Sequence, residues 1–249
     1  MEAVLAKIRP HTASSLSHQK APAKILTALE ATFNEQKADK TPAAYFAGLL
    51  TLFDSTVAQE KDTGLKFGDG DRLPAELYLL ALICPFVPAP IIRANLNTLM
   101  ALTEPLWSPI NSHAPALRSL LTLYNSVLRA LDRVQLEKQT VRQSFATVLQ
   151  FCVDPRPKVR KRAADIVRDV LASPPSPLLR HPYAERVGEW SVNALSEVNN
   201  IGSNKQKGKV NLGDVNGTAI HLITFIRPVL SYLPSSVSKH SSLYIHHMY

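Results

Sequence analysis

Two amphipathic helical patterns separated by a turn of a few residues constrain this chain more than any other feature. In the first pattern, apolar residues recur at steps of three and four (Val141, Phe145, Val148, Leu149 and Cys152). The second pattern, over 156–172, has apolar residues on one face and charged residues on the opposite face. We expect Asp154 to be its N-cap, with Pro155 just inside the helix. Two helices joined so closely bury their apolar faces against neighbours, so the sequence predicts a helical-hairpin repeat unit.

The order of residues in this hairpin resembles a HEAT repeat. Asp154-Pro155, Val159-Arg160 and Ala163-Ala164 follow one another as in the D-P-x-x-x-V-R pattern of the HEAT turn and inner helix. The pattern combines a capped turn, a β-branched core residue, a long cation and small residues where helices approach. Arg160 lies at the edge of the apolar stripe, so we assign it to structure, as a bridge to a neighbouring repeat.

Helical periodicity recurs from about residue 23 to about residue 233. It predicts nine helices, at about 23–36, 42–53, 74–84, 89–102, 114–131, 135–152, 156–172, 182–195 and 218–233. Most of the 18 prolines precede apolar stretches and punctuate helices rather than break them. The predicted fold is therefore all-α, a HEAT- or armadillo-like right-handed helical-repeat solenoid of four to five helix pairs. An all-α bundle is the alternative.

The domain organisation follows from where this periodicity stops. Residues 1–20 are polar and aperiodic and are expected to form a partly ordered arm. The repeat domain is predicted over 21–233, with loops at 59–73 and 199–217. The Ser- and His-rich segment 234–249 is expected to be a poorly ordered tail.

The composition limits the possible partners. With 249 residues, 45% of them hydrophobic, the chain can bury a substantial core, and 9 glycines with little alternation argue against a sheet protein. Leu77 to Ile92 is uncharged, but it is shorter than the ~20 residues of a spanning helix and is cut by prolines, so no membrane partner is expected. The N-terminal apolar run is too short for a secretory signal. A net charge of +8 favours nucleic acid or an acidic protein surface as partner.

The positive charge is concentrated in the region of the two-helix pattern. From Arg129 to Asp169 there are ten Lys/Arg and five Asp/Glu. Cations on a rigid helical face can neutralise phosphates and give salt-sensitive RNA affinity. The candidate RNA- or partner-binding residues are Arg156, Lys158, Lys161, Arg162, Arg168, Lys205, Lys207 and Lys209. The alternative is a solvated face on which Lys161 and Arg162 pair with Asp165, and a plain flexible loop that contains the last three lysines.

Other candidate sites carry weaker signals. Gly64, Gly68 and Gly70 lack the context of a phosphate or calcium loop and predict a surface turn. Cys84 and Cys152 lie in apolar runs and are expected to be buried small hydrophobes. Histidines of the tail could bind a metal only weakly. We therefore expect no catalytic residue, no metal, no cofactor and no small-molecule substrate.

Three stretches carry a more specific likeness: 8–22 with the helix that follows, Thr41–Leu50, and Asp154–Ala163. Together they resemble the N-terminal region of the ribosomal RNA-processing protein 12 family of fungi, from about residue 8 to about 232. The resemblance implies an all-helical HEAT-repeat protein of the nucleolus and nucleus that acts on ribosomal subunit precursors and in their export. Family members are much longer, so this chain is expected to be a fragment or a truncated gene product.

The expected function is a non-enzymatic scaffold that binds pre-ribosomal RNA and ribosome assembly proteins through its basic helical surface. A karyopherin-like adaptor, which binds a nuclear GTPase or nuclear-pore repeats, is the alternative and would bring in nuclear transport machinery. An enzyme is the weakest hypothesis, and a deep pocket of ionisable residues would support it.

Overall fold

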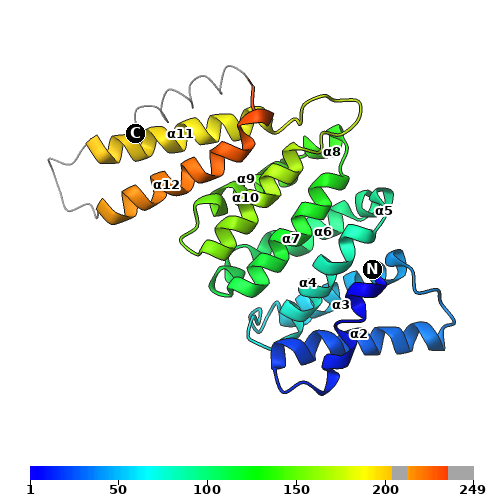
Figure 1. Cartoon of the computed structure of the whole chain (residues 1–249). Coiled ribbons are helices and arrows are strands. Elements are labelled where there is room, and N and C mark those ends of the chain that lie inside the picture. The colour runs from blue at the N-terminus through cyan, green and yellow to red at the C-terminus, as the bar shows by residue number, and fades with distance from the viewer. Residues whose placement is uncertain (204–211, 235–249) are drawn as a thin grey trace. The chain divides into compact units, whose positions relative to one another are not determined.

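The computed structural model (Figure 1) describes residues 1–203 and 212–234 of the chain. These residues form α-helices, short 3₁₀ helices and turns, and no strand occurs among them. The expectation of an all-α helical-repeat fold is therefore confirmed. The chain divides into two compact units, Met1–Leu131 and Asp132–Tyr249, which are described in turn.

The first unit is built around a central helix, α4. Its α-helices are α1 (Glu2–Leu5), α2 (Ser17–Glu35), α3 (Pro42–Glu60), α4 (Arg72–Ile83), α5 (Ala89–Ala94), α6 (Leu96–Thr103) and α7 (Ala114–Ala130). Helix α4 packs against α2, α3 and α7. Contacts with the next helix but one, such as α2 with α4, are typical of stacked helical hairpins.

Apolar periodicity explains the core of this unit. Tyr45, Phe46 and Phe53 lie at helical spacing on α3 and are fully buried. The ring of Phe33 on α2 meets the ring of Tyr45 edge to face, with centroids 5.1 Å apart. Thr41 caps α3 as expected, because its hydroxyl accepts a hydrogen bond from the backbone N–H of Ala44.

The N-terminal segment differs from the expected arm. It contains α1 and a 3₁₀ turn over Arg9–Ala13, and Leu5 is fully buried. The guanidinium of Arg9 donates to the carboxylate of Glu30 on α2 at 2.8 and 3.0 Å and also pairs with Glu2. Because these partners are distant in sequence and none is part of an apolar pattern, periodicity did not reveal this anchor.

The second unit contains the two-helix pattern. Its α-helices are α8 (Arg133–Leu136), α9 (Gln139–Gln150), α10 (Pro157–Leu171), α11 (Ala184–Ser203) and α12 (Leu212–Val229). Helices α9 and α10 pack on each other through a 3₁₀ turn over Phe151–Val153, and α11 packs on α12. Helix α12 also contacts α10 and the 3₁₀ turn. Two successive hairpins are thus stacked, as Figure 1 shows for α9 to α12.

Several helix boundaries differ from the expected ones. The helix predicted over 89–102 is interrupted at Asn95, whose side-chain amide donates to the carbonyl of Ile91 at 2.9 Å. The helix predicted over 135–152 is interrupted by an extended Lys138. Helix α11 continues to Ser203 and α12 begins at Leu212, so helix enters the predicted loop 199–217 from both sides. The predicted tail 235–249 lies outside the described residues.

Candidate nucleic-acid interface

The turn before α10 is held by two arginines. The carboxylate of Asp154 accepts hydrogen bonds from the backbone N–H and the side chain of Arg156, each at 2.8 Å. The guanidinium of Arg160 donates to the backbone carbonyls of Asp154 and Pro155. Burial alone would raise the pKa of Asp154, but the hydrogen bonds from Arg156 outweigh it and hold this pKa below its ordinary value.

The N-cap residue of α10 differs from the expected one, Asp154. The N-cap is Arg156 and the first helical residue is Pro157, so Asp154 and Pro155 lie outside the helix. The reason is local, because the carboxylate of Asp154 bonds the N–H of the residue two positions on and closes a turn before the helix begins. Arg160 has a structural role as expected, but its hydrogen bonds go to the turn of its own hairpin.

The apolar face of α10 is buried as periodicity predicts. Its buried residues are Val159, Ala163, Ile166, Val167, Val170 and Leu171. Their burial against α9 and α12 fixes the rotation of α10 and therefore fixes which side chains face solvent. Lys158 and Lys161 lie on the outer side and are exposed, whereas Arg162 is half-buried. Within the described chain, neither of the two lysines has a carboxylate within ion-pair distance.

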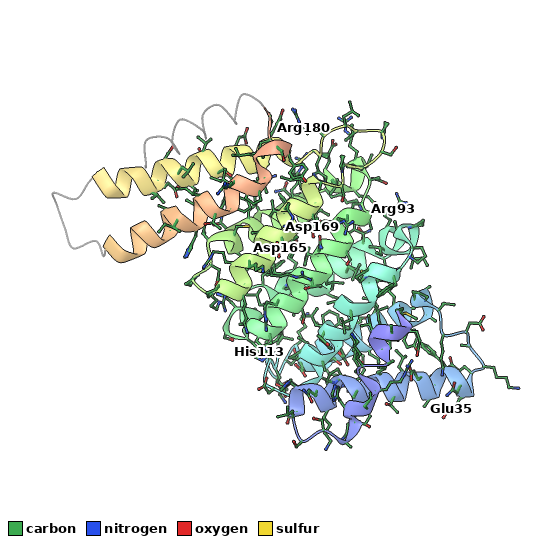
Figure 2. The ribbon with its side chains drawn as sticks, in the orientation of Figure 1. Glu35, Arg93, His113, Asp165, Asp169 and Arg180 are labelled. Carbon is green, nitrogen blue, oxygen red and sulfur yellow. The ribbon has the colours of Figure 1, made fainter. Side chains whose placement is uncertain are left out.

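Arg168 belongs to an acidic environment at the other end of α10. Its guanidinium pairs with Asp165 at 3.2 Å and with Asp169 at 2.9 Å, and Figure 2 labels these two aspartates one turn apart on the helix. The hydrogen bonds that Arg168 donates to Asp169 raise the pKa of Arg168. The solvated-face alternative predicted that Lys161 and Arg162 pair with Asp165; in the structure Asp165 pairs with Arg168, and Lys161 has no carboxylate within ion-pair distance among the described residues. Lys158 and Lys161, which have no carboxylate partner among the described residues, both lie in the N-terminal half of α10.

The candidate residues of α10 therefore fall into two groups. Lys158 and Lys161 present open charge beside Arg162, whereas Arg156 and Arg168 are engaged in ion pairs. The other three candidates, Lys205, Lys207 and Lys209, lie outside the described residues.

The two cysteines and the glycine-containing loop considered from the sequence have structural roles. Cys84 and Cys152 are buried free thiols, and burial raises the pKa of Cys84 to about 12 and that of Cys152 well above its ordinary value. Such thiols stay protonated and are poor nucleophiles. In the predicted loop 59–73, the carboxylate of Asp71 accepts the N–H of Gly68 and closes a turn at the surface. The described side chains include no group of three or more His, Cys, Asp or Glu that could hold a metal ion.

Sequence reasoning missed one concave site, a pocket of about 600 Å³ in the second unit. It is lined by residues of α8, α9, the segment before α11, and α11 itself, among them Arg142 and Arg186. No local pattern signals it, because its arginines are spread over some fifty positions and converge only in the folded chain. In the described part of the chain, no helix is both long and apolar enough to cross a membrane.

Hairpins stacked through next-but-one helices, with an Asp-Pro turn and a structural arginine, define a helical-repeat protein of the HEAT type. A family model described as "RRP12-like, N-terminal HEAT repeats" matches residues 7–249. The chain belongs to this family, which confirms the resemblance seen in the sequence.

Individual relatives agree with this assignment. Ribosomal RNA-processing protein 12 of Saccharomyces cerevisiae is 28% identical over 244 residues, which covers 93% of this chain and 20% of that protein. RRP12-like proteins of Gallus gallus and Homo sapiens are each 25% identical over 227 and 224 residues, covering 86% and 88% of this chain. The same alignments cover 15% and 16% of those two proteins. The chain thus spans about a fifth, or less, of the length of these relatives.

Proposed function

We propose that this chain is a non-catalytic scaffold in ribosomal RNA processing, which binds pre-ribosomal RNA and ribosome assembly proteins in the nucleolus and nucleus. Membership of the RRP12-like family supports the process, because a relative is named for ribosomal RNA processing. The observation that carries RNA binding is the exposed pair Lys158 and Lys161 on a helix whose rotation is fixed by its buried face.

The physical basis is electrostatic. Lysines in a row on a rigid helix can contact successive phosphates without reading base identity, and each contact releases counterions. Such binding is salt-sensitive and independent of sequence. Arg162 belongs to the same proposed surface, and Lys205, Lys207 and Lys209 would extend it. Arg156 and Arg168 contribute less, because carboxylates already offset their charge.

Two finer parts of the proposal rest on the family and the fold class. A role in export of ribosomal subunits, with contacts to nuclear transport machinery, follows from the family resemblance. A scaffold without a reaction of its own follows from the repeat class, in which helices present an extended surface. A cellular test would locate the fluorescently labelled chain in the nucleolus or nucleus and would measure its co-purification with precursor RNA.

The direct test is RNA binding by a charge-reversal variant. Lys158→Glu, Lys161→Glu and Arg162→Glu combined should weaken binding of a labelled single-stranded RNA by about tenfold or more at ~0.1 M salt. The matched control makes the same charge change at Lys7, Lys24 and Lys61, exposed lysines of the first unit. If both variants weaken binding equally, net charge alone acts and the α10 surface is rejected. If neither does, RNA binding by this surface is rejected.

A further inference from the structure

The pocket of the second unit is lined by four arginines and three glutamates. Its volume is about 600 Å³, and its arginines come from four parts of the chain: α8, α9, the segment before α11, and α11. They are Arg133, Arg142, Arg180 and Arg186. Figure 2 labels Arg180, on the segment that leads into α11.

The floor of this pocket is rigid. The hydroxyl of Tyr183 donates to the backbone carbonyl of Leu136 at 2.6 Å, and its ring packs against the ring of Phe145 at a tilt of 31°, with centroids 4.3 Å apart. Nδ1 of His181 accepts the N–H of Tyr183 at 3.1 Å, and burial lowers the pKa of His181 to about 4. The histidine is therefore neutral near pH 7, and both rings are fixed. Fixed side chains lose little conformational entropy when a ligand binds, so this part of the pocket is preorganised.

The arginines differ in whether a carboxylate neutralises them. Arg133 pairs with Glu137 at 3.2 Å. Arg142 and Arg186 face the same tyrosine, since the positive charge of each opposes the rise that burial causes in the pKa of Tyr183. Among the described residues, no ion pair is formed by Arg142, Arg180 or Arg186. Three guanidinium groups of the pocket thus form no ion pair with a carboxylate of the described residues.

The acidic residues of the pocket narrow the choice of ligand. Glu185 and Glu189 lie one turn apart at the start of α11, next to the arginines. A ligand that presented only anionic groups to the pocket, with no hydrogen-bond donor, would be repelled by them. A ribonucleotide suits a mixed lining, because its phosphate accepts from guanidinium groups while its 2′-hydroxyl donates to a carboxylate. The buried rings of His181 and Tyr183 leave no open aromatic face for base stacking.

We propose that this pocket binds a single phosphodiester of RNA, with Arg142 and Arg186 on the phosphate and Glu185 or Glu189 on the ribose 2′-hydroxyl. This inference rests on the proposed RNA-binding function but assigns it a second, separate site. The α10 surface supplies affinity without discrimination, and the pocket supplies a preference for RNA over DNA. A peptide with acidic side chains is the competing occupant.

The test measures binding of labelled 12-nucleotide oligouridine and oligothymidine to the whole chain. Arg186→Gln and, separately, Arg142→Gln should each weaken RNA binding about tenfold, the loss expected for one charge-assisted contact. Arg227→Gln, an exposed arginine of α12 outside the pocket, is the matched control and should change binding less than twofold. Arg142 is half-buried, so thermal melts check folding, and the exposed Arg186 keeps the test valid if Arg142→Gln unfolds.

A second arm tests the glutamates. Glu185→Ala with Glu189→Ala should raise DNA binding more than RNA binding and so lower the ratio of RNA to DNA affinity. An unchanged ratio, or wild-type RNA binding by both arginine variants, overturns the proposal. If those variants instead lose binding of a labelled glutamate-rich peptide, the pocket is a peptide site. Loss of RNA binding in the α10 variant alone leaves the proposed function standing, whereas no RNA binding by the wild type removes both.

Discussion

The hydroxyl of Tyr183 bonds to the backbone carbonyl of Leu136 across 47 positions of sequence, with 2.6 Å between the two oxygens. The bond ties the start of α11 to the end of α8, where the last carbonyls of a helix lack partners within the helix. Burial raises the pKa of Tyr183, so the hydroxyl stays a proton donor through the neutral range. This bond therefore joins the residues that precede the α9–α10 hairpin to those that precede the α11–α12 hairpin.

Tyr183→Phe should lower the free energy of unfolding by about 1–2 kcal/mol, because it leaves a buried carbonyl without its donor. The measurement is urea denaturation followed by circular dichroism. Tyr232→Phe is the matched control, since the hydroxyl of Tyr232 has no hydrogen-bond partner among the described residues. An equal effect of both substitutions would show that the bond to Leu136 does not stabilise the unit.

Asp154→Asn should destabilise the chain by about 1 kcal/mol near pH 7, because it weakens the charge-assisted bonds from Arg156. The pKa of Asp154 is lowered in the folded state below its ordinary 3.8. Its contribution is therefore present above pH 3.8 and is lost as the pH falls through the folded value. Denaturation at several pH values should show the two proteins converging in acid. A constant difference down to pH 2 would contradict this account.

Glu76→Gln should stabilise the chain, whereas Asp154→Asn should destabilise it. Burial raises the pKa of Glu76 above 4.5 and outweighs the opposing effects of Thr56 and Arg72. One carboxylate oxygen has no partner among the described residues, and the other accepts from Thr56 at 3.0 Å and from Arg72 at 3.3 Å. The folded state then holds a proton that the unfolded state releases, so stability falls as the pH rises above 4.5. Glutamine removes this dependence and should stabilise the chain by about 1 kcal/mol at pH 7. This prediction would be refuted if the Glu76→Gln variant were less stable than the wild type at pH 7 and its stability depended on pH as that of the wild type does.

Gly70→Ala should destabilise the first unit more than Gly64→Ala does. Both glycines have positive φ, +94° and +90°, so alanine strains either backbone by about 1 kcal/mol. A Cβ at Gly70 would also lie 2.8 Å from the Cβ of Ser17, whereas one at Gly64 meets nothing within 4 Å. Thermal denaturation of both variants isolates the contact with Ser17. Equal losses would show that the loop moves away from α2.

The helices of the fold could be predicted because they depend on local patterns. Val159, Ile166 and Val170 are buried as their spacing on α10 requires. The position of the cap could not be predicted to the residue, because Asp154 is compatible with both a cap and a turn before the helix. The anchor from Arg9 to Glu30 was also missed, since an ion pair between segments leaves no periodic trace in the sequence.

In the candidate site, too, local patterns predicted some features, and others depended on contacts formed in the folded chain. Amphipathic spacing correctly indicated that Lys158 and Lys161 lie on the outer face of α10. The sequence does not show which cations form ion pairs with carboxylates, because this depends on side-chain rotamers and on neighbouring side chains. The pairing of Arg168 with Asp165 and Asp169 could therefore be seen only in the structure. The convergence of Arg142 and Arg186 depends on the packing of α9 against the segment before α11, which sequence spacing does not encode.

The central claim is electrostatic RNA binding through the N-terminal half of α10, and its most direct measurement is the RNA association constant as a function of salt. For the wild type, the logarithm of this constant should fall linearly with the logarithm of salt concentration. Reversing Lys158, Lys161 and Arg162 to Glu should flatten the slope by about 2, since each phosphate contact on single-stranded RNA contributes about 0.7. A folded variant with the wild-type slope and affinity would contradict the account.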